Sequence, residues 1–61
     1  MDSMQIMLAG IPLDVEFFLN AHGRASIFRA TPHGLPREND LLPYLNEETV
    51  ADICQQVEAA N

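Results

Sequence analysis

The stretch VEFFLNAHGRASIFRA, residues 15–30, decides the fold, because it can form either a hairpin or a helix. As a hairpin it turns at His22-Gly23, where glycine suits the second turn position and histidine tolerates a positive φ. That register sets Glu16 opposite Arg29, so that opposite charges face each other across the strands. The other predicted pairs are Val15 with Ala30, Phe17 with Phe28, and Phe18 with Ile27. We therefore predict strands over residues 15–21 and 24–30.

The predicted hairpin divides its side chains between two faces. The first face is core-like and holds Val15, Phe17, Leu19, Ala21 and Phe28. The second is half apolar and holds Glu16, Phe18, Asn20, Ile27 and Arg29. We expect Phe18 and Ile27 to lie on the uncovered side of the sheet. Such a pair can be ordinary surface, but on so short a chain it is also a candidate dimer seam or partner site.

A competing interpretation makes residues 13–22 a helix. Asp14 could cap it and Gly23 could end it. Helical spacing also relates Ile11, Val15, Phe18, Leu19 and His22. The valine, the two phenylalanines and the Glu16–Arg29 pair favour the hairpin.

Outside the hairpin, the sequence predicts one more strand and a long connection. The run MQIMLA, residues 4–9, is apolar and is followed by Gly10 and Pro12, which fits a strand buried on both faces. Two prolines and a glycine in residues 31–36 disfavour both a helix and the hydrogen-bond ladder of a sheet. Residues 31–45 are therefore expected to be loop. Within it, residues 41–45 are expected to cross the sheet as an extended apolar segment.

The C-terminal residues 47–60 are expected to form an amphipathic helix. Asn46 is a good N-cap, because its side-chain oxygen can accept from free backbone N–H groups of the first turn. Glu47 and Glu48 place negative charge at the positive end of the helix dipole. The apolar stripe consists of Val50, Ile53, Cys54 and Val57. The predicted fold class is therefore α+β: a small three-stranded antiparallel β-meander with one C-terminal helix.

Length and charge limit what the chain can do. Its 61 residues allow one small domain. A single cysteine excludes an internal disulfide and fits a cytoplasmic protein. The formal charge of −6, with no lysine, opposes generic nucleic-acid binding and attraction to anionic membranes. The charge is divided, however, because the arginines lie at residues 24–37 and no base follows residue 38. One interpretation is that the two halves attract each other in the fold.

No residue pattern indicates catalysis. Ser3 and Ser26 have no motif context, and His22, His33 and Cys54 lack the spacing of metal ligands. The glycines are isolated, which excludes a phosphate-binding loop. We therefore expect no enzyme, no cofactor and no metal site.

The predicted function is that of a small acidic regulator or inhibitor that docks on a larger host or cognate protein, with a homodimer expected. Such proteins are common products of phage and mobile elements, acting against host defence or in host takeover. The candidate partner-binding residues are Phe18, Ile27, Glu47, Glu48, Asp52 and Glu58. One alternative is a nucleic-acid-binding regulator that uses Arg24, Arg29 and Arg37, with phenylalanines stacking on bases. A second alternative is a structural subunit of a larger assembly.

Overall fold

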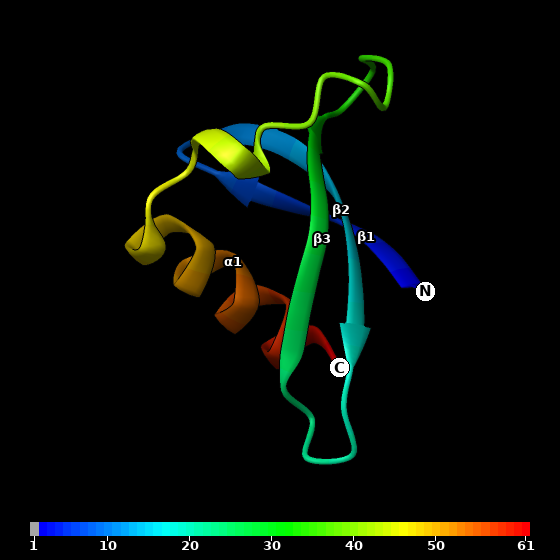
Figure 1. The fold of residues 1–61 in the computed structure, drawn as a ribbon, viewed down its shortest axis with the longest axis vertical. Coiled ribbons are helices and arrows are strands. Elements are labelled where there is room, and N and C mark those ends of the chain that lie inside the picture. Colours follow the sequence, from blue (N-terminus) through cyan, green and yellow to red (C-terminus); the bar gives the residue numbers. More distant parts are fainter. Residues whose placement is uncertain (1) are drawn as a thin grey trace.

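Three antiparallel strands form one open sheet in the order β1-β2-β3, and a single C-terminal helix lies across one face of it (Figure 1). A computed structural model describes residues 2–61. The strands are β1 (Asp2–Leu8), β2 (Ile11–Leu19) and β3 (Ala25–Pro32). A short 3-10 helix, η1 (Leu42–Tyr44), precedes helix α1 (Glu47–Ala60). The predicted α+β meander is confirmed, and the helical alternative for residues 13–22 is wrong.

A two-residue turn joins β1 to β2. Leu8 pairs with Ile11, and both residues between them have positive φ, 50° at Ala9 and 81° at Gly10. Positive φ at both positions is the conformation of a type I′ turn, whose twist matches that of the flanking strands. The chain thus re-enters the sheet at Ile11, four residues before the predicted start of this strand. Pro12 is tolerated because the β2–β3 ladder ends at the Leu13–Pro32 pair, beyond which the Pro12 carbonyl accepts from His33 N.

Replacing Ala9 with asparagine is expected to stabilise the protein. Alanine in the left-handed region costs roughly 1–2 kcal/mol because its Cβ crowds the following carbonyl. Asparagine tolerates that region better and precedes glycine in the preferred turn pair. We expect A9N to raise the free energy of unfolding by about 0.5–1 kcal/mol, measured by urea denaturation. An unchanged or lower value would show that Ala9 carries no strain.

Between β2 and β3, the hairpin closes with a three-residue loop, Ala21-His22-Gly23, flanked by Asn20 and Arg24. Asn20 N donates to the Arg24 carbonyl, and Gly23 N donates to the Asn20 carbonyl, both at 3.0 Å. Gly23 has a φ of 76°, as expected where a type I turn is followed by a left-handed glycine. The Asn20 side chain accepts from His22 N at 2.8 Å and from Arg24 N at 3.0 Å. The predicted two-residue turn at His22-Gly23 is therefore wrong by one residue.

A β-bulge in β3 compensates for the extra loop residue. Near the loop, Phe17 pairs with Ile27 and Phe18 with Ser26, so the predicted Phe17–Phe28 and Phe18–Ile27 pairs are wrong. Phe28 has no partner in register, and beyond it the predicted Glu16–Arg29 and Val15–Ala30 pairs are confirmed. A bulge of this kind inserts one unpaired residue and reverses the alternation of side chains.

The bulge also exchanges the places of Ile27 and Phe28. Ile27 is half-buried and packs against the core, so the prediction that it lies on the open side with Phe18 is wrong. Phe28 is 51% exposed instead of belonging to the core-like face. Because side chains alternate along a strand, Ser26 and Phe28 lie on the face opposite Ile27. That is the face of Glu16 and Phe18.

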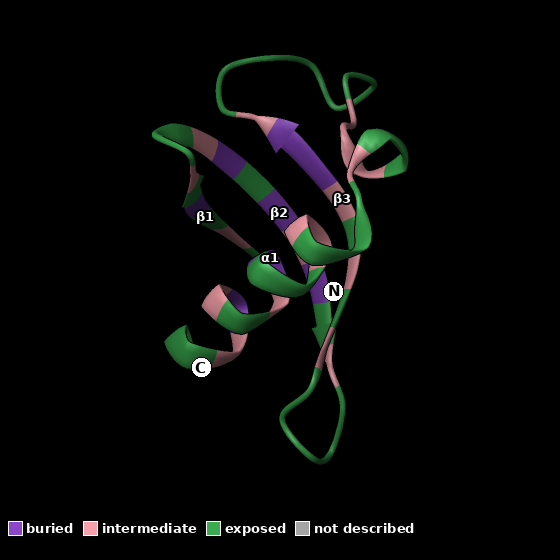
Figure 2. Ribbon diagram, turned by 90° about the vertical axis from the view of Figure 1, so that its left-hand side faces the viewer, coloured by how far each residue is buried: buried purple, intermediate pink, exposed green. Residues whose placement is uncertain are grey.

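The hydrophobic core lies between the sheet and α1 (Figure 2). Its buried members are Ile6, Leu13, Val15, Phe17, Ala30, Ile53 and Val57. In β1 only alternate residues face this core, since Gln5 and Met7 are exposed on either side of Ile6. The prediction that this strand is buried on both faces is wrong, because α1 covers only one face of the sheet. The Asn46 cap is confirmed, its side chain accepting from Thr49 N at 2.8 Å.

Residues 33–45 return the chain along the outer edge of β3. Leu41 N donates to the Ala30 carbonyl at 2.8 Å, and Asp40 Oδ1 accepts from Ala30 N at 2.9 Å. Asp40 Oδ1 also accepts from Leu42 N at 3.0 Å, where η1 begins. The predicted extended crossing over residues 41–45 is therefore wrong in its central part, where the chain forms a helical turn. Leu41 and Leu45 pack against the core on the way into α1.

Candidate protein-contact surface

The face of the sheet turned away from α1 holds two exposed phenylalanines. Phe18 on β2 and Phe28 on β3 are 54% and 51% exposed. Phe18 pairs with Ser26, two residues from Phe28 on the same face, so the two rings are diagonal neighbours across the strands. Exposed aromatic side chains gathered on one face are typical of protein-contact surfaces. We call this side of the sheet the open face.

A half-buried carboxylate organises the charges of the open face. Glu16 lies on β2 and pairs with two arginines: its Oε2 lies 3.2 Å from Arg29 Nε, and its Oε1 accepts from Arg37 Nη2 at 2.8 Å. Arg29 Nη1 also donates to the Arg37 carbonyl at 2.8 Å, which ties the loop after β3 to the sheet. Because both arginines pair with Glu16 and Arg29 also donates to the Arg37 carbonyl, the three residues form one network.

A second pair of side chains lies at the loop end of the same face. His33 Nδ1 lies 3.1 Å from both carboxylate oxygens of Asp14, and both side chains are at least half exposed. Asp14 lies on β2 opposite Thr31 of β3, so the His33 side chain reaches from the end of β3 to the neighbouring strand. An exposed pair of this kind adds little stability, but it leaves Asp14 with a partner within the chain.

Two of the three arginines are thus paired with a carboxylate from within the sheet. Arg29 and Arg37 pair with Glu16, which precedes them, and not with the acidic C-terminal segment. The interpretation that the two charged halves attract each other is therefore wrong for these two arginines. Arg24 lies apart at the hairpin, in a hollow that it shares with Cys54 and Glu58 of α1. The three arginines do not form one basic patch, and Phe17, a candidate for base stacking, is buried.

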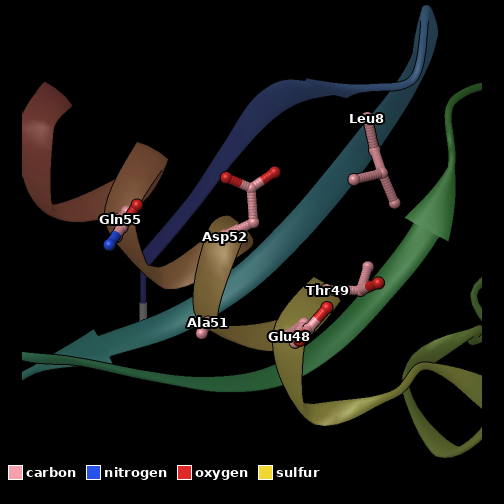
Figure 3. A pocket seen from close by; sticks show the side chains of 6 residues that line it. All are labelled: Leu8, Glu48, Thr49, Ala51, Asp52 and Gln55. Atoms are coloured by element: carbon pink, nitrogen blue, oxygen red, sulfur yellow. The ribbon is translucent and has the colours of Figure 1, made fainter.

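The acidic candidates divide into an exposed group and one structural residue. Glu47, Glu48 and Asp52 are exposed on α1. Glu48 and Asp52 line an open hollow of about 400 Å³ beside the end of β1; Figure 3 shows Leu8 facing the helix there. Glu58 differs, because its Oε2 accepts from Ala25 N at 2.9 Å and holds the start of β3 to the helix. To bind a partner through this carboxylate oxygen, Glu58 would have to give up its hydrogen bond with Ala25 N.

The thiol of Cys54 is half-buried on α1, with its Sγ 3.7 Å from the Ala25 carbonyl. Burial raises the pKa of the Cys54 thiol, and the negative charge of Glu58 raises it further. A raised thiol pKa leaves less thiolate, the reactive form, at neutral pH. Sequence reasoning placed Cys54 on the apolar stripe but overlooked Glu58, which the i, i+4 spacing on the predicted helix makes its neighbour.

We expect Cys54 to react slowly with iodoacetamide at pH 7.5 and to accelerate as the pH rises above the ordinary range of a cysteine thiol. E58Q should lower the pKa of Cys54, because it removes the negative charge while keeping a hydrogen-bond acceptor. The pH dependence of the alkylation rate in the folded protein measures both effects. A rate profile that E58Q leaves in place would contradict the contribution of Glu58.

Within residues 2–61, no group of three or more histidine, cysteine, aspartate or glutamate side chains is arranged to hold a metal ion. His22 lies at the tip of the β2–β3 hairpin and His33 at the other end of the sheet, so the fold does not bring them together. None of the helices described is both long and apolar enough to span a bilayer. No protein-family model, curated protein or solved structure matches the chain.

Proposed function

We propose that this protein is a small acidic regulator that acts by binding another protein through its open face. The observation that supports this is the pair of half-exposed rings, Phe18 and Phe28, on a sheet that has a helix on only one side. Burying aromatic rings supplies a large part of the binding energy in protein interfaces. The lone cysteine fits action in the cytoplasm.

The polar part of the open face suits a protein partner better than nucleic acid. Nucleic-acid binding needs cations free to neutralise phosphates. Here Arg29 and Arg37 already share one carboxylate, so half of their formal charge is offset before any ligand arrives. A polar, neutral border around aromatic side chains is instead the common composition of a protein interface.

Site-specific photo-crosslinking tests the proposal. Benzoylphenylalanine is introduced at position 18 on the open face and, in a matched protein, at position 44. Tyr44 is a suitable control because it is aromatic and 85% exposed, yet lies on η1 beyond the edge of β3. Irradiation in the cells that carry the gene should give a discrete protein adduct at position 18 and none at position 44.

The masses of the adducts identify what contacts the face, whether a larger protein or a second copy of this chain. Equal adduct yields at positions 18 and 44, or none at position 18, would contradict a specific contact surface there. F28D in the chain labelled at position 18 provides a second check. It should abolish the adduct if the two rings form one surface.

A further inference from the structure

The distribution of charge separates the molecule into two sides. The chain has nine acids and three arginines, which gives a formal charge of −6. The charged side chains of the open face are two acids, Asp14 and Glu16, and two arginines, Arg29 and Arg37, with the formally neutral His33 beside Asp14. Their formal charges cancel. The remaining seven acids and one arginine therefore carry the whole −6, and they lie elsewhere in the chain.

We propose that the open face binds a second copy of this chain, related to the first by a two-fold axis. This inference rests on the proposed function and names the partner of the same surface. A two-fold interface brings the same patch of both copies together, so residues near the axis meet their own counterparts. A patch with a net charge repels itself in that arrangement. The open face has none, and its centre is aromatic.

The other surfaces of the chain do not suit self-association. The exterior of α1 carries Glu47, Glu48 and Asp52, which would face their own copies. The outer edge of β1 has the same difficulty, because Glu48 and Asp52 line the hollow beside Leu8. That edge is also partly engaged, since Gln56 Nε2 donates to the Met7 carbonyl at 3.1 Å. The outer edge of β3 is bound by Asp40 and Leu41 at Ala30.

The small size of the core gives self-association a physical reason. Among residues 2–61, the cluster of buried apolar residues has seven members. The single cysteine rules out an internal disulfide. Chains of this length bury a small fraction of their surface and often gain further burial from a partner chain. Pairing two open faces covers the uncovered side of both sheets and leaves both acidic helices outside, free to meet a basic surface on a larger protein.

Sedimentation equilibrium on the purified protein, from low micromolar to millimolar concentration, tests the inference. The wild-type chain should form a dimer, and F18D and F28D should each raise its dissociation constant by about tenfold or more. Y44D is the matched control, because it adds the same charge at an exposed aromatic residue off the face, and it should leave the constant unchanged. Circular dichroism confirms that each variant keeps its helix. F28D supplies the result if F18D fails to fold.

Salt gives an independent measurement. Two chains of charge −6 repel each other, and screening reduces that repulsion, so the dimer should become tighter as salt is raised from about 0.05 to 0.5 M. A dimer that weakens with salt is held by ion pairs between the copies and overturns the inference. So does a dimer that survives both F18D and F28D, which would place the contact elsewhere.

A wild-type chain that stays monomeric at the highest concentration also overturns the inference. The proposed function is judged separately, by the photo-adduct at position 18 in cells. A monomer in solution that gives a foreign protein adduct at that position refutes the second copy and supports the contact surface. A monomer that gives no adduct refutes both.

Discussion

Replacing Phe17 with alanine is expected to remove most of the stability of the protein, whereas the same change at Phe18 should leave the fold intact. Phe17 is 2% exposed and belongs to the core cluster between the sheet and α1. Truncating a buried phenylalanine costs about 3–5 kcal/mol, from lost burial and the cavity left behind. A domain of this length has a total of roughly 3–9 kcal/mol. F17A should therefore be largely or partly unfolded at 25 °C.

Phe18 is the natural control for Phe17, since it is the same residue type one position along the same strand. It is 54% exposed, and an exposed substitution usually changes the free energy of unfolding by about 0.5 kcal/mol or less. Urea denaturation followed by circular dichroism, at concentrations where the chain is monomeric, measures both variants. Equal losses at the two positions would contradict the assignment of Phe17 to the core and Phe18 to the open face.

The alternation within the predicted strand, residues 15–21, made the inward side of β2 predictable from Val15 to Leu19. Val15, Phe17 and Leu19 were assigned to one face from spacing alone, and all three lie on the core side. The helix was equally predictable, because its cap, its acidic first turn and its apolar stripe agree with one another. Its predicted bounds, residues 47–60, are those of the structure.

The open face was only half predictable, because two irregularities in the hairpin cancel. The three-residue loop shifts the register by one, and the bulge at Phe28 shifts it back, so Glu16 still meets Arg29. The Glu16–Arg29 pair therefore identified the correct register on the far side of the bulge from the loop. It gave no sign that the register nearer the loop differs by one residue. Whether a turn has two or three residues depends on the backbone at Gly23, which local composition does not determine.

The contact between Glu16 and Arg37 could not be predicted from the sequence, for a different reason. Arg37 lies 21 residues from Glu16, in a segment without regular structure, and reaches it only because the chain folds back over the sheet after Pro32. No periodicity relates such residues. The same holds for the bond between Glu58 and Ala25 N, which spans 33 residues. Contacts of this range depend on the path of the loop, and a residue pattern records only local geometry.

Asp40 is expected to be the most important residue of that loop path. Its Oδ1 accepts from Ala30 N at 2.9 Å and from Leu42 N at 3.0 Å, both partly buried, and so joins the edge of β3 to the start of η1. D40A leaves two backbone donors without their acceptor, and we expect it to lower the free energy of unfolding by about 2–3 kcal/mol. D40N keeps an oxygen in place and should lose about 1 kcal/mol or less.

A variant at Glu38 distinguishes the effect of the Asp40 hydrogen bonds from the effect of its negative charge. It is an exposed acid two residues earlier in the same loop, so E38A removes the same negative charge without removing an acceptor from a buried N–H group. In a chain of charge −6, losing one acid relieves some repulsion, and E38A should be neutral or slightly stabilising. Denaturation of the three variants in parallel decides the matter. If D40A and E38A behave alike, Asp40 contributes by charge alone, and the return of the chain along β3 is held by the packing of Leu41 and Leu45.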